Sequence, residues 1–191
     1  MSDVQSTGES RSFGESRIDI NTLLDEFYPS PTGHSQLGEF ECVESVPPPN
    51  DRLLDHHEHM TVTVESHFGD AVDVHVHRCK KQGEWYSREI TLVTKQERKI
   101  VQHGIVRLDT SKLDTGVWKK IESQGIPLGR VLIEHNVLRE VQMCQLWKVI
   151  AGPSLAAMMH LQIGETLYGR TALIFCDGEP AIELLEIVTP A

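Results

Sequence analysis

Hydrophobic and polar residues alternate along much of the chain from residue 60 onward, a period of two that is typical of strands with one buried face. Four successive segments have this pattern and are separated by short turns: residues 60–67, 71–79, 85–94 and 99–109. A longer segment at 137–152 predicts another strand, and segments 168–176 and 180–188 predict a C-terminal hairpin. Because consecutive strands are joined by connections of hairpin length, we expect an antiparallel sheet.

Other segments have apolar residues at helical spacing, and the sequence predicts short helices at 20–28, 110–124, 127–134 and 153–161. Residues 29–50 are predicted as a long loop, either a flap or an ordered wrap around the domain. Residues 1–17 are rich in Ser, Gly and Glu and are expected to form a disordered tail. The sequence therefore predicts one α+β domain over 18–191, with roughly six to seven antiparallel strands and a few short helices.

Composition narrows the possible partners. The 191 residues carry a formal net charge of −10, which argues against nucleic acid or an anionic membrane as the main partner. A small anionic molecule remains compatible with a local cationic pocket. There is no apolar run of membrane-spanning length and no signal-peptide pattern, and the four cysteines are widely spaced. We therefore expect a cytoplasmic protein with reduced thiols.

Three charged residues occupy strand positions whose neighbours of the same parity are apolar: Arg88, Arg170 and Glu186. All three are expected on the apolar side of the sheet, where an unpaired charge is costly. Two interpretations stay open. The charges form a pocket for a polar ligand, or they are structural, with Arg88 paired to Glu186 and Arg170 reaching solvent at a strand end. Arginine favours the first, because its guanidinium can bind a carboxylate through two hydrogen bonds.

Histidines raise the question of a metal site. His56, His57 and His59 cluster in the segment 55–60, and His75 and His77 share one face of a predicted strand. However, the His-Glu-x-x-His spacing is absent, and the two strand histidines lie opposite the apolar face, so we expect surface histidines and no metal. Glycine patterns for phosphate or dinucleotide binding are also absent, and no cofactor is expected.

Short motifs follow one another in a particular order: Met-Thr at 60–61, Arg-Glu at 88–89, Pro-Leu-Gly-Arg-x-Leu at 127–132, Gly-Arg at 169–170 and Gly-x-Pro…Glu-x-x-x-Pro at 178–190. In this order they resemble the chorismate lyase family, cofactor-independent enzymes that split chorismate into 4-hydroxybenzoate and pyruvate. The resemblance covers roughly residues 55–190. It implies a chorismate lyase-like α+β fold, in which a sheet and small helices enclose an aromatic carboxylate.

The resemblance also implies roles for individual residues. Arg88 would bind the ring carboxylate, helped by the backbone N–H of Met60. Glu186 and the backbone N–H of Leu128 would hold the 4-oxygen of the ring, and Arg170 would meet the second carboxylate of chorismate. Glu186 and Arg88 are the expected catalytic residues of a carbon–oxygen lyase, with Glu186 handling the proton.

Departures from the family pattern leave alternatives open. The segment before Met60 is unusually rich in histidine, and Glu183 competes with Glu186 for the position of the pocket carboxylate. The chain could instead be a non-catalytic binding module for an aromatic or hydroxy carboxylic acid, similar to the effector domain of some bacterial transcription regulators, or a related lyase acting on a different carboxylate. The sequence shows no helix-turn-helix segment before the domain, which favours the enzyme.

Overall fold

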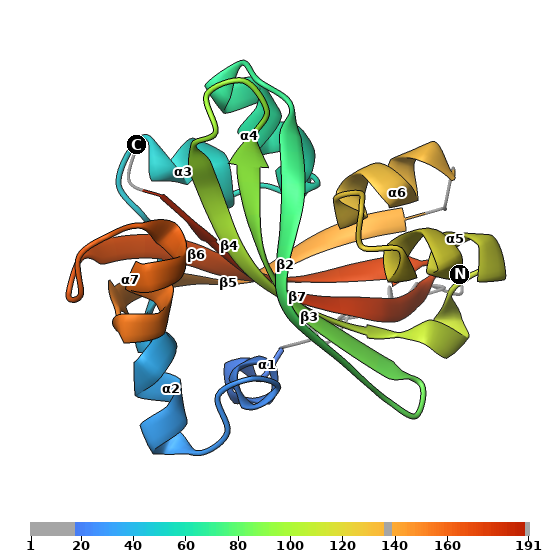
Figure 1. Ribbon diagram of the computed structural model, residues 1–191, viewed down its shortest axis with the longest axis horizontal. Helices are drawn as coiled ribbons and strands as arrows, with labels where there is room; N and C mark the ends of the chain where they lie inside the picture. The colour runs from blue at the N-terminus through green and yellow to red at the C-terminus, as the bar shows by residue number, and fades with distance from the viewer. Residues whose placement is uncertain (1–17, 136–138, 190–191) are drawn as a thin grey trace, which may run out of the picture.

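The computed structural model describes residues 18–135 and 139–189, so the tail predicted at 1–17 lies outside the described residues. At its centre is one antiparallel sheet of seven strands in the order β1-β5-β6-β7-β4-β3-β2 (Figure 1). The strands are β1 (Gly38–Val43), β2 (Val72–Gln82), β3 (Trp85–Thr94), β4 (Ile100–Asp109), β5 (Arg139–Ala151), β6 (Thr166–Cys176) and β7 (Glu179–Val188). The predicted α+β class with an antiparallel sheet is therefore confirmed.

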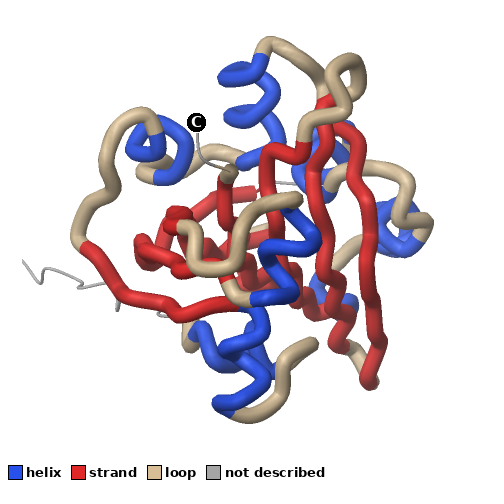
Figure 2. The backbone as a smooth tube through the Cα atoms, turned by 60° about the vertical axis from the view of Figure 1, so that its left-hand side comes forward, coloured by secondary structure: helices blue, strands red, loops and turns tan. Residues whose placement is uncertain are grey.

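Short helices cover both faces of this sheet (Figure 2). They are α1 (Ile20–Asp25), α2 (Pro31–Leu37), α3 (Asn50–Leu54), α4 (Met60–Phe68), α5 (Thr115–Glu122), α6 (Leu128–Glu134), α7 (Pro153–Met159) and a 3₁₀ turn at Thr110–Lys112. Buried side chains of α1, α2 and α7 pack on one face in a single apolar cluster. On the other face, α5 and α6 belong to one cluster, and α3 and α4 to a second.

One predicted strand is wrong. Residues 60–67 do not join the sheet but form most of α4, which ends at Gly69 in the left-handed conformation (φ 65°). A strand would have placed Met60, Val62 and Val64 on one face, whereas in the helix Val62 is 43% exposed and Thr61 is buried instead. Over so short a segment, the two periodicities are hard to distinguish.

The loop predicted at 29–50 is also wrong as a single loop, because it contains α2 and the edge strand β1. Strand β1 pairs with β5 along its whole length, from Gly38 opposite Ala151 to Val43 opposite Leu146. It therefore supplies the strand that residues 60–67 do not. The four predicted helices are confirmed, each with shorter bounds than predicted.

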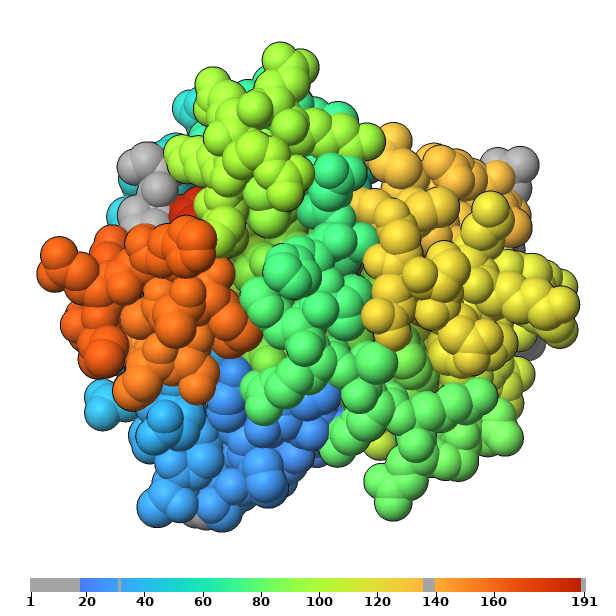
Figure 3. All heavy atoms as spheres, in the orientation of Figure 1, coloured from blue at the N-terminus to red at the C-terminus, as the bar shows by residue number. Residues whose placement is uncertain are grey.

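The connection after α5 reaches across to β2. Figure 3 shows β2 crossing the middle of one face of the molecule, with the α5–α6 region on one side and α7 on the other. Gln124 donates a hydrogen bond from Nε2 to Cys79 Sγ at 3.1 Å and lies 3.4 Å from the Tyr86 hydroxyl. These contacts hold the segment that leads into α6 against the sheet.

Candidate ligand-binding site

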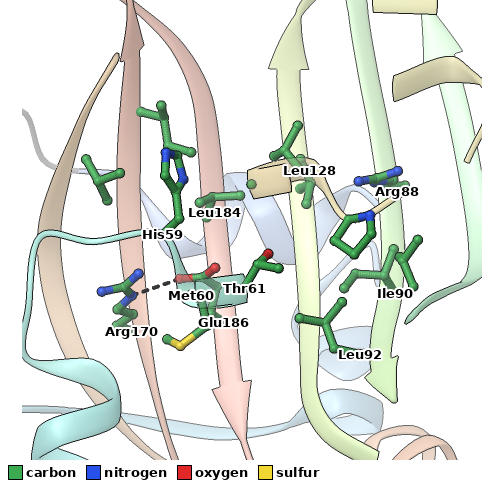
Figure 4. Close-up of a pocket in the computed structure, with 16 residues that line it drawn as sticks. His59, Met60, Thr61, Arg88, Ile90, Leu92, Leu128, Arg170, Leu184 and Glu186 are labelled. Carbon is green, nitrogen blue, oxygen red and sulfur yellow. Dashed lines mark hydrogen bonds and ion pairs between the residues drawn. The ribbon is translucent and has the colours of Figure 1, made fainter. Parts of the chain in front are cut away.

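A pocket lies between the sheet face that carries the three predicted charges and the N-terminal ends of α4 and α6 (Figure 4). Its cavity volume, taken as the space that the centre of a water molecule can occupy, is about 40 Å³. Its polar side chains are His59, Thr61, Arg88, Arg170 and Glu186, and its remaining lining is Met60, Val74, Ile90, Leu92, Val106, Pro127, Leu128, Gly129, Val141, Ile174 and Leu184. A mostly apolar cavity with a few converging polar groups is typical of sites for small organic ligands.

Strand order sets the distance between the charges. Arg170 on β6 lies directly opposite Glu186 on β7, whereas Arg88 lies on β3, with β4 between it and β7. Neighbouring strands are about 4.8 Å apart, so the backbone at Arg88 lies about 10 Å to one side of Glu186. Figure 4 shows Arg88 across the pocket from the Arg170–Glu186 pair.

Arg170 is fully buried (0% exposed), and its hydrogen-bonding groups are well supplied with partners. Its Nε donates to Glu186 Oε2 at 2.8 Å, which compensates the positive charge. Its two terminal nitrogens donate to three backbone carbonyls, those of Leu54 (3.3 Å), His56 (2.8 Å) and Glu58 (3.0 Å). Arg170 therefore ties the histidine-rich segment between α3 and α4 to the sheet.

Arg88 is in the opposite situation. It is 1% exposed, and its Nε and Nη1 are buried with no hydrogen-bond partner within the ranges that the structure describes. Burial lowers the pKa of the Arg88 guanidinium, while the nearby Tyr86 hydroxyl and Cys79 thiol act in the opposite direction. A buried polar group without a partner is rare in folded proteins and costs stability. Among the described residues, Arg88 thus has no carboxylate partner, and its positive charge lies on the wall of the pocket.

The ends of two helices form the opposite wall. Met60 is the first residue of α4 and Leu128 the first of α6, and the leading N–H groups of a helix have no partner inside it. Gly129 lets these ends approach, because a Cβ there would lie 2.9 Å from Thr61 Oγ1. The glycine of the Pro-Leu-Gly motif is therefore required by the contact between the two helices.

The glycine of the Gly-Arg motif has a similar explanation. A Cβ on Gly169 would lie 2.6 Å from the Glu186 carbonyl oxygen and 3.1 Å from the Ile187 side chain. Only glycine lets β6 and β7 pair this closely beside the buried ion pair. The motif thus positions Arg170 next to Glu186.

The structure brings all five predicted site residues, Met60, Arg88, Leu128, Arg170 and Glu186, around this one pocket. It is Arg170, and not Arg88, that pairs with Glu186, and Arg170 does not reach solvent.

Glu183 lies on the other face of the sheet. There its Oε2 accepts a hydrogen bond from Arg107 Nη1 at 2.7 Å, and Arg107 Nε also donates to Glu26. Thr61 and His59, which line the pocket, were not singled out as ligand contacts from the sequence. Their position at the pocket depends on residues 60–67 being helical, so it could not be predicted while this segment was taken for a strand.

Glu89, the neighbour of Arg88, is fully buried on the opposite face. It accepts hydrogen bonds from the Tyr28 hydroxyl (2.6 Å), Arg78 Nε (2.8 Å) and His103 Nε2 (3.0 Å). Burial alone would raise the pKa of Glu89, but hydrogen bonds and the charge of His103, with the bonds from Tyr28 and Arg78, lower it to about 2. This cluster could not be recognised from the sequence, because its partners come from three separate segments.

Residues 18–135 and 139–189 contain neither a metal-ligand cluster nor a membrane-spanning helix. Within these ranges no three His, Cys, Asp or Glu side chains converge in a way that would hold a metal ion. None of the helices described there is long and apolar enough to span a membrane.

Comparison with known proteins finds no relative by sequence. It finds solved structures with a similar fold. No family model matches the chain, and no curated protein matches it. Among solved structures, the effector domain of PhnF from Mycobacterium smegmatis aligns over 69% of this chain and 87% of its own, with 10% identity and a TM-score of 0.52.

PhnF itself aligns over 68% of this chain and 63% of its own, with 8% identity and the same TM-score. The ligand-binding domain of a GntR-family transcriptional regulator from Bordetella bronchiseptica aligns over 62% of this chain and 85% of its own, with 14% identity and a TM-score of 0.46. At these identities the likeness concerns the fold alone. The chain therefore has the α+β fold of the PhnF effector domain, to which the chorismate lyase-like fold is related.

Proposed function

We propose that this protein binds a small carboxylic acid with an apolar, ring-sized body, and that the ligand carboxylate lies on Arg88. The observation that carries the proposal is the buried guanidinium of Arg88, whose Nε and Nη1 have no partner among the described residues. A ligand carboxylate would compensate that charge with charge-assisted hydrogen bonds. A fold that keeps an unpaired buried cation bears a cost that such a ligand removes.

The rest of the pocket fits the remainder of such a ligand. Apolar side chains on the sheet, such as Ile90, Val106 and Leu184, supply walls for a ring. The Glu186 carboxylate and the first N–H groups of α6 would face a hydroxyl on the far side. Glu186 already compensates the charge of Arg170, so the charge of Arg88 remains to be neutralised. One ligand carboxylate is enough to neutralise it. The comparison with an effector domain supports a binding module of this kind.

A second candidate is the lyase reaction itself. Its support is that the five residues that match the chorismate lyase motifs surround one pocket. In this reaction chorismate loses its C4 proton and its C–O bond to enolpyruvate breaks, which yields pyruvate and aromatic 4-hydroxybenzoate. Glu186 would accept the proton. However, chorismate has two carboxylates, and Arg170 is already engaged by Glu186 and three carbonyls, so we place binding before catalysis.

Calorimetric titration with 4-hydroxybenzoate tests the binding proposal. The wild-type protein should bind one equivalent, and Arg88→Met, which keeps the length of the side chain, should weaken binding by roughly 30-fold or more. Equal affinity in both proteins would contradict the role of Arg88.

Incubation with chorismate then separates the two candidates, because only a lyase releases pyruvate. Pyruvate formation that disappears in Glu186→Gln would establish catalysis. Binding of 4-hydroxybenzoate without pyruvate formation from chorismate would identify a binding module.

A further inference from the structure

His56 lies in the segment between α3 and α4 and has a defined hydrogen-bonding arrangement. Its Nε2 is 2.7 Å from the Leu53 carbonyl oxygen, which can only accept. Its Nδ1 accepts a hydrogen bond from the Glu58 backbone N–H at 3.1 Å and lies 3.3 Å from Arg170 Nη1. Both neighbours of Nδ1 are donors, so the ring is neutral, with its proton on Nε2.

A second proton on His56 would break this arrangement. The new N–H at Nδ1 would point at two donors, one of which is a cation. Burial and the charge of Arg170 lower the pKa of His56, while the Leu53 carbonyl and the carboxylates of Glu186 and Glu58 act in the opposite direction. These groups from α3, β6, β7 and the segment itself are the charged and hydrogen-bonding neighbours of the ring.

The segment that His56 stabilises leads directly into the pocket wall. The carbonyls of Leu54, His56 and Glu58 all accept from Arg170, and the next residues along the chain are His59, Met60 and Thr61 of the pocket. The position of the first turn of α4 therefore depends on the contact between the segment and Arg170. A positive charge on His56 repels Arg170 at that contact.

We propose that His56 is a positioning residue that makes ligand binding pH-dependent. The neutral His56 ring holds the start of α4 against the pocket through Arg170, and protonation of the ring releases the start of α4. The proposal rests on the proposed function, since the ligand is the small carboxylate on Arg88. It assigns a role to the histidine-rich segment that requires no metal ion.

The expected sign of the pH effect is informative, because simple charge attraction predicts the opposite. A protonated histidine beside an anion site would strengthen the binding of a carboxylate as the pH falls. Release of the start of α4 should instead weaken the binding of the carboxylate as the pH falls. The direction of the change in affinity therefore distinguishes His56 as a positioning residue from His56 as an additional cation.

Two substitutions test the acceptor at Nδ1 and the donor at Nε2 of the His56 ring separately. His56→Asn places an acceptor oxygen where Nδ1 lies and cannot take up a proton. His56→Gln extends an amide donor toward the Leu53 carbonyl and lacks the acceptor that faces Arg170 and the Glu58 N–H. His67→Gln, an exposed change near the far end of α4, is the matched control.

The experiment is calorimetric titration with 4-hydroxybenzoate between about pH 7.5 and about pH 5.5, where the ligand carboxylate stays ionised. In the wild type and in His67→Gln, the Kd should rise as the pH falls, approaching about tenfold per pH unit once His56 titrates. His56→Asn should bind with wild-type affinity at the upper pH and show a flat profile. His56→Gln should bind weakly throughout.

Two results would overturn the proposal: affinity that stays constant or increases over the pH range in which the His56 ring takes up its proton, or a pH dependence that persists in His56→Asn. A second readout needs no ligand. In NMR spectra of the protein alone, the amide resonances of Met60 and Thr61 should shift with the titration of the His56 ring, and should not do so in His56→Asn. Shifts of this kind without any binding of 4-hydroxybenzoate would support the coupling and reject the proposed ligand, whereas their absence would reject the coupling.

Discussion

Two arginines on the same sheet face differ in their partners. This difference indicates a structural role for Arg170 and a ligand-binding role for Arg88. Arg170 has a carboxylate and three carbonyls, whereas Arg88 has two buried nitrogens without a partner among the described residues. Removing one member of a compensated buried pair leaves a charge behind, while removing an uncompensated charge relieves a cost. The two residues should therefore respond to the same substitution with opposite signs.

Substitution by methionine tests this contrast. Arg88→Met should raise the free energy of unfolding by about 1 kcal/mol or more, because an unpaired buried cation is replaced by an apolar chain. Arg170→Met should lower it by about 3–5 kcal/mol, because Glu186 loses its counter-charge. Urea unfolding of the ligand-free proteins measures both. A large loss of stability in Arg88→Met would mean that its guanidinium already has a partner.

The two glutamates of β7 give a second test at this scale. Glu186→Gln should weaken the binding of 4-hydroxybenzoate and lower stability, because it removes the charge that compensates Arg170. Glu183→Gln should leave binding unchanged, since its side chain meets Arg107 on the other face. Titration of both variants measures this, and a loss of binding in Glu183→Gln alone would contradict the assignment of Glu186 to the pocket.

Side-chain parity predicted which face Arg88, Arg170 and Glu186 occupy, because alternation along a strand is a local property. It could not predict which arginine pairs with Glu186. That choice depends on β6 and β4 both lying beside β7, with β3 one strand further away, and strand order is set by the whole chain. For the same reason, the partners of Glu89 could not be predicted from the sequence.

At the scale of elements, the pocket depends on how closely α4 and α6 approach. Their contact is made by Gly129 on α6 and Thr61 on α4. The Pro-Leu-Gly motif was recognisable from the sequence, but the reason for its glycine was not, since residues 60–67 were predicted as a strand. Over nine residues, the alternation of Thr and Val is typical of a half-buried strand and leaves no clear helical period.

Gly129→Ala should move the two helix ends apart, because its methyl group would lie 2.9 Å from Thr61 Oγ1. We expect a loss of about 1–3 kcal/mol in stability together with weaker ligand binding. Gly125→Ala is the control, since the nearest atom to its Cβ is 4.0 Å away. Thermal unfolding and titration of both variants check this, and equal behaviour of the two would show that the close contact is not needed.

At the scale of the whole molecule, the sheet separates two polar clusters with different roles. On the pocket face, Arg88 has no carboxylate partner in the part of the chain that the structure describes, whereas on the other face Glu89 is surrounded by Tyr28, Arg78 and His103. These three residues come from the segment after α1, from β2 and from β4, so the cluster joins distant parts of the chain. We infer that this cluster stabilises the fold.

Acid unfolding tests the role of the Glu89 cluster. The pKa of Glu89 is lowered from 4.5 to about 2, so below about pH 4.5 the unfolded chain takes up a proton that the folded chain does not. The contribution, on the order of 3 kcal/mol, is present above pH 4.5 and is lost as the pH falls toward 2. Urea unfolding across this range should show a weaker pH dependence in Glu89→Gln than in the wild type. The exposed variant Glu122→Gln should keep the wild-type dependence; if Glu89→Gln also kept it, the cluster would not be the source.

The class of fold was predictable as a whole, because strands with short connections permit few architectures. The edge strand β1 was not, since a six-residue strand with little burial carries a weak signal. The function depends on the same global arrangement, which brings Arg88, Glu186 and the ends of α4 and α6 around one cavity.

A crystal structure of the protein with 4-hydroxybenzoate would show whether Arg88 binds the ligand carboxylate. The ligand carboxylate should lie within hydrogen-bond distance of Arg88 Nε or Nη1, the ring against Val106 and Leu184, and the hydroxyl on the side of Glu186. A ligand carboxylate bound to any other group, or an Arg88 guanidinium paired with a protein carboxylate while the pocket stays empty at saturating ligand, would contradict it.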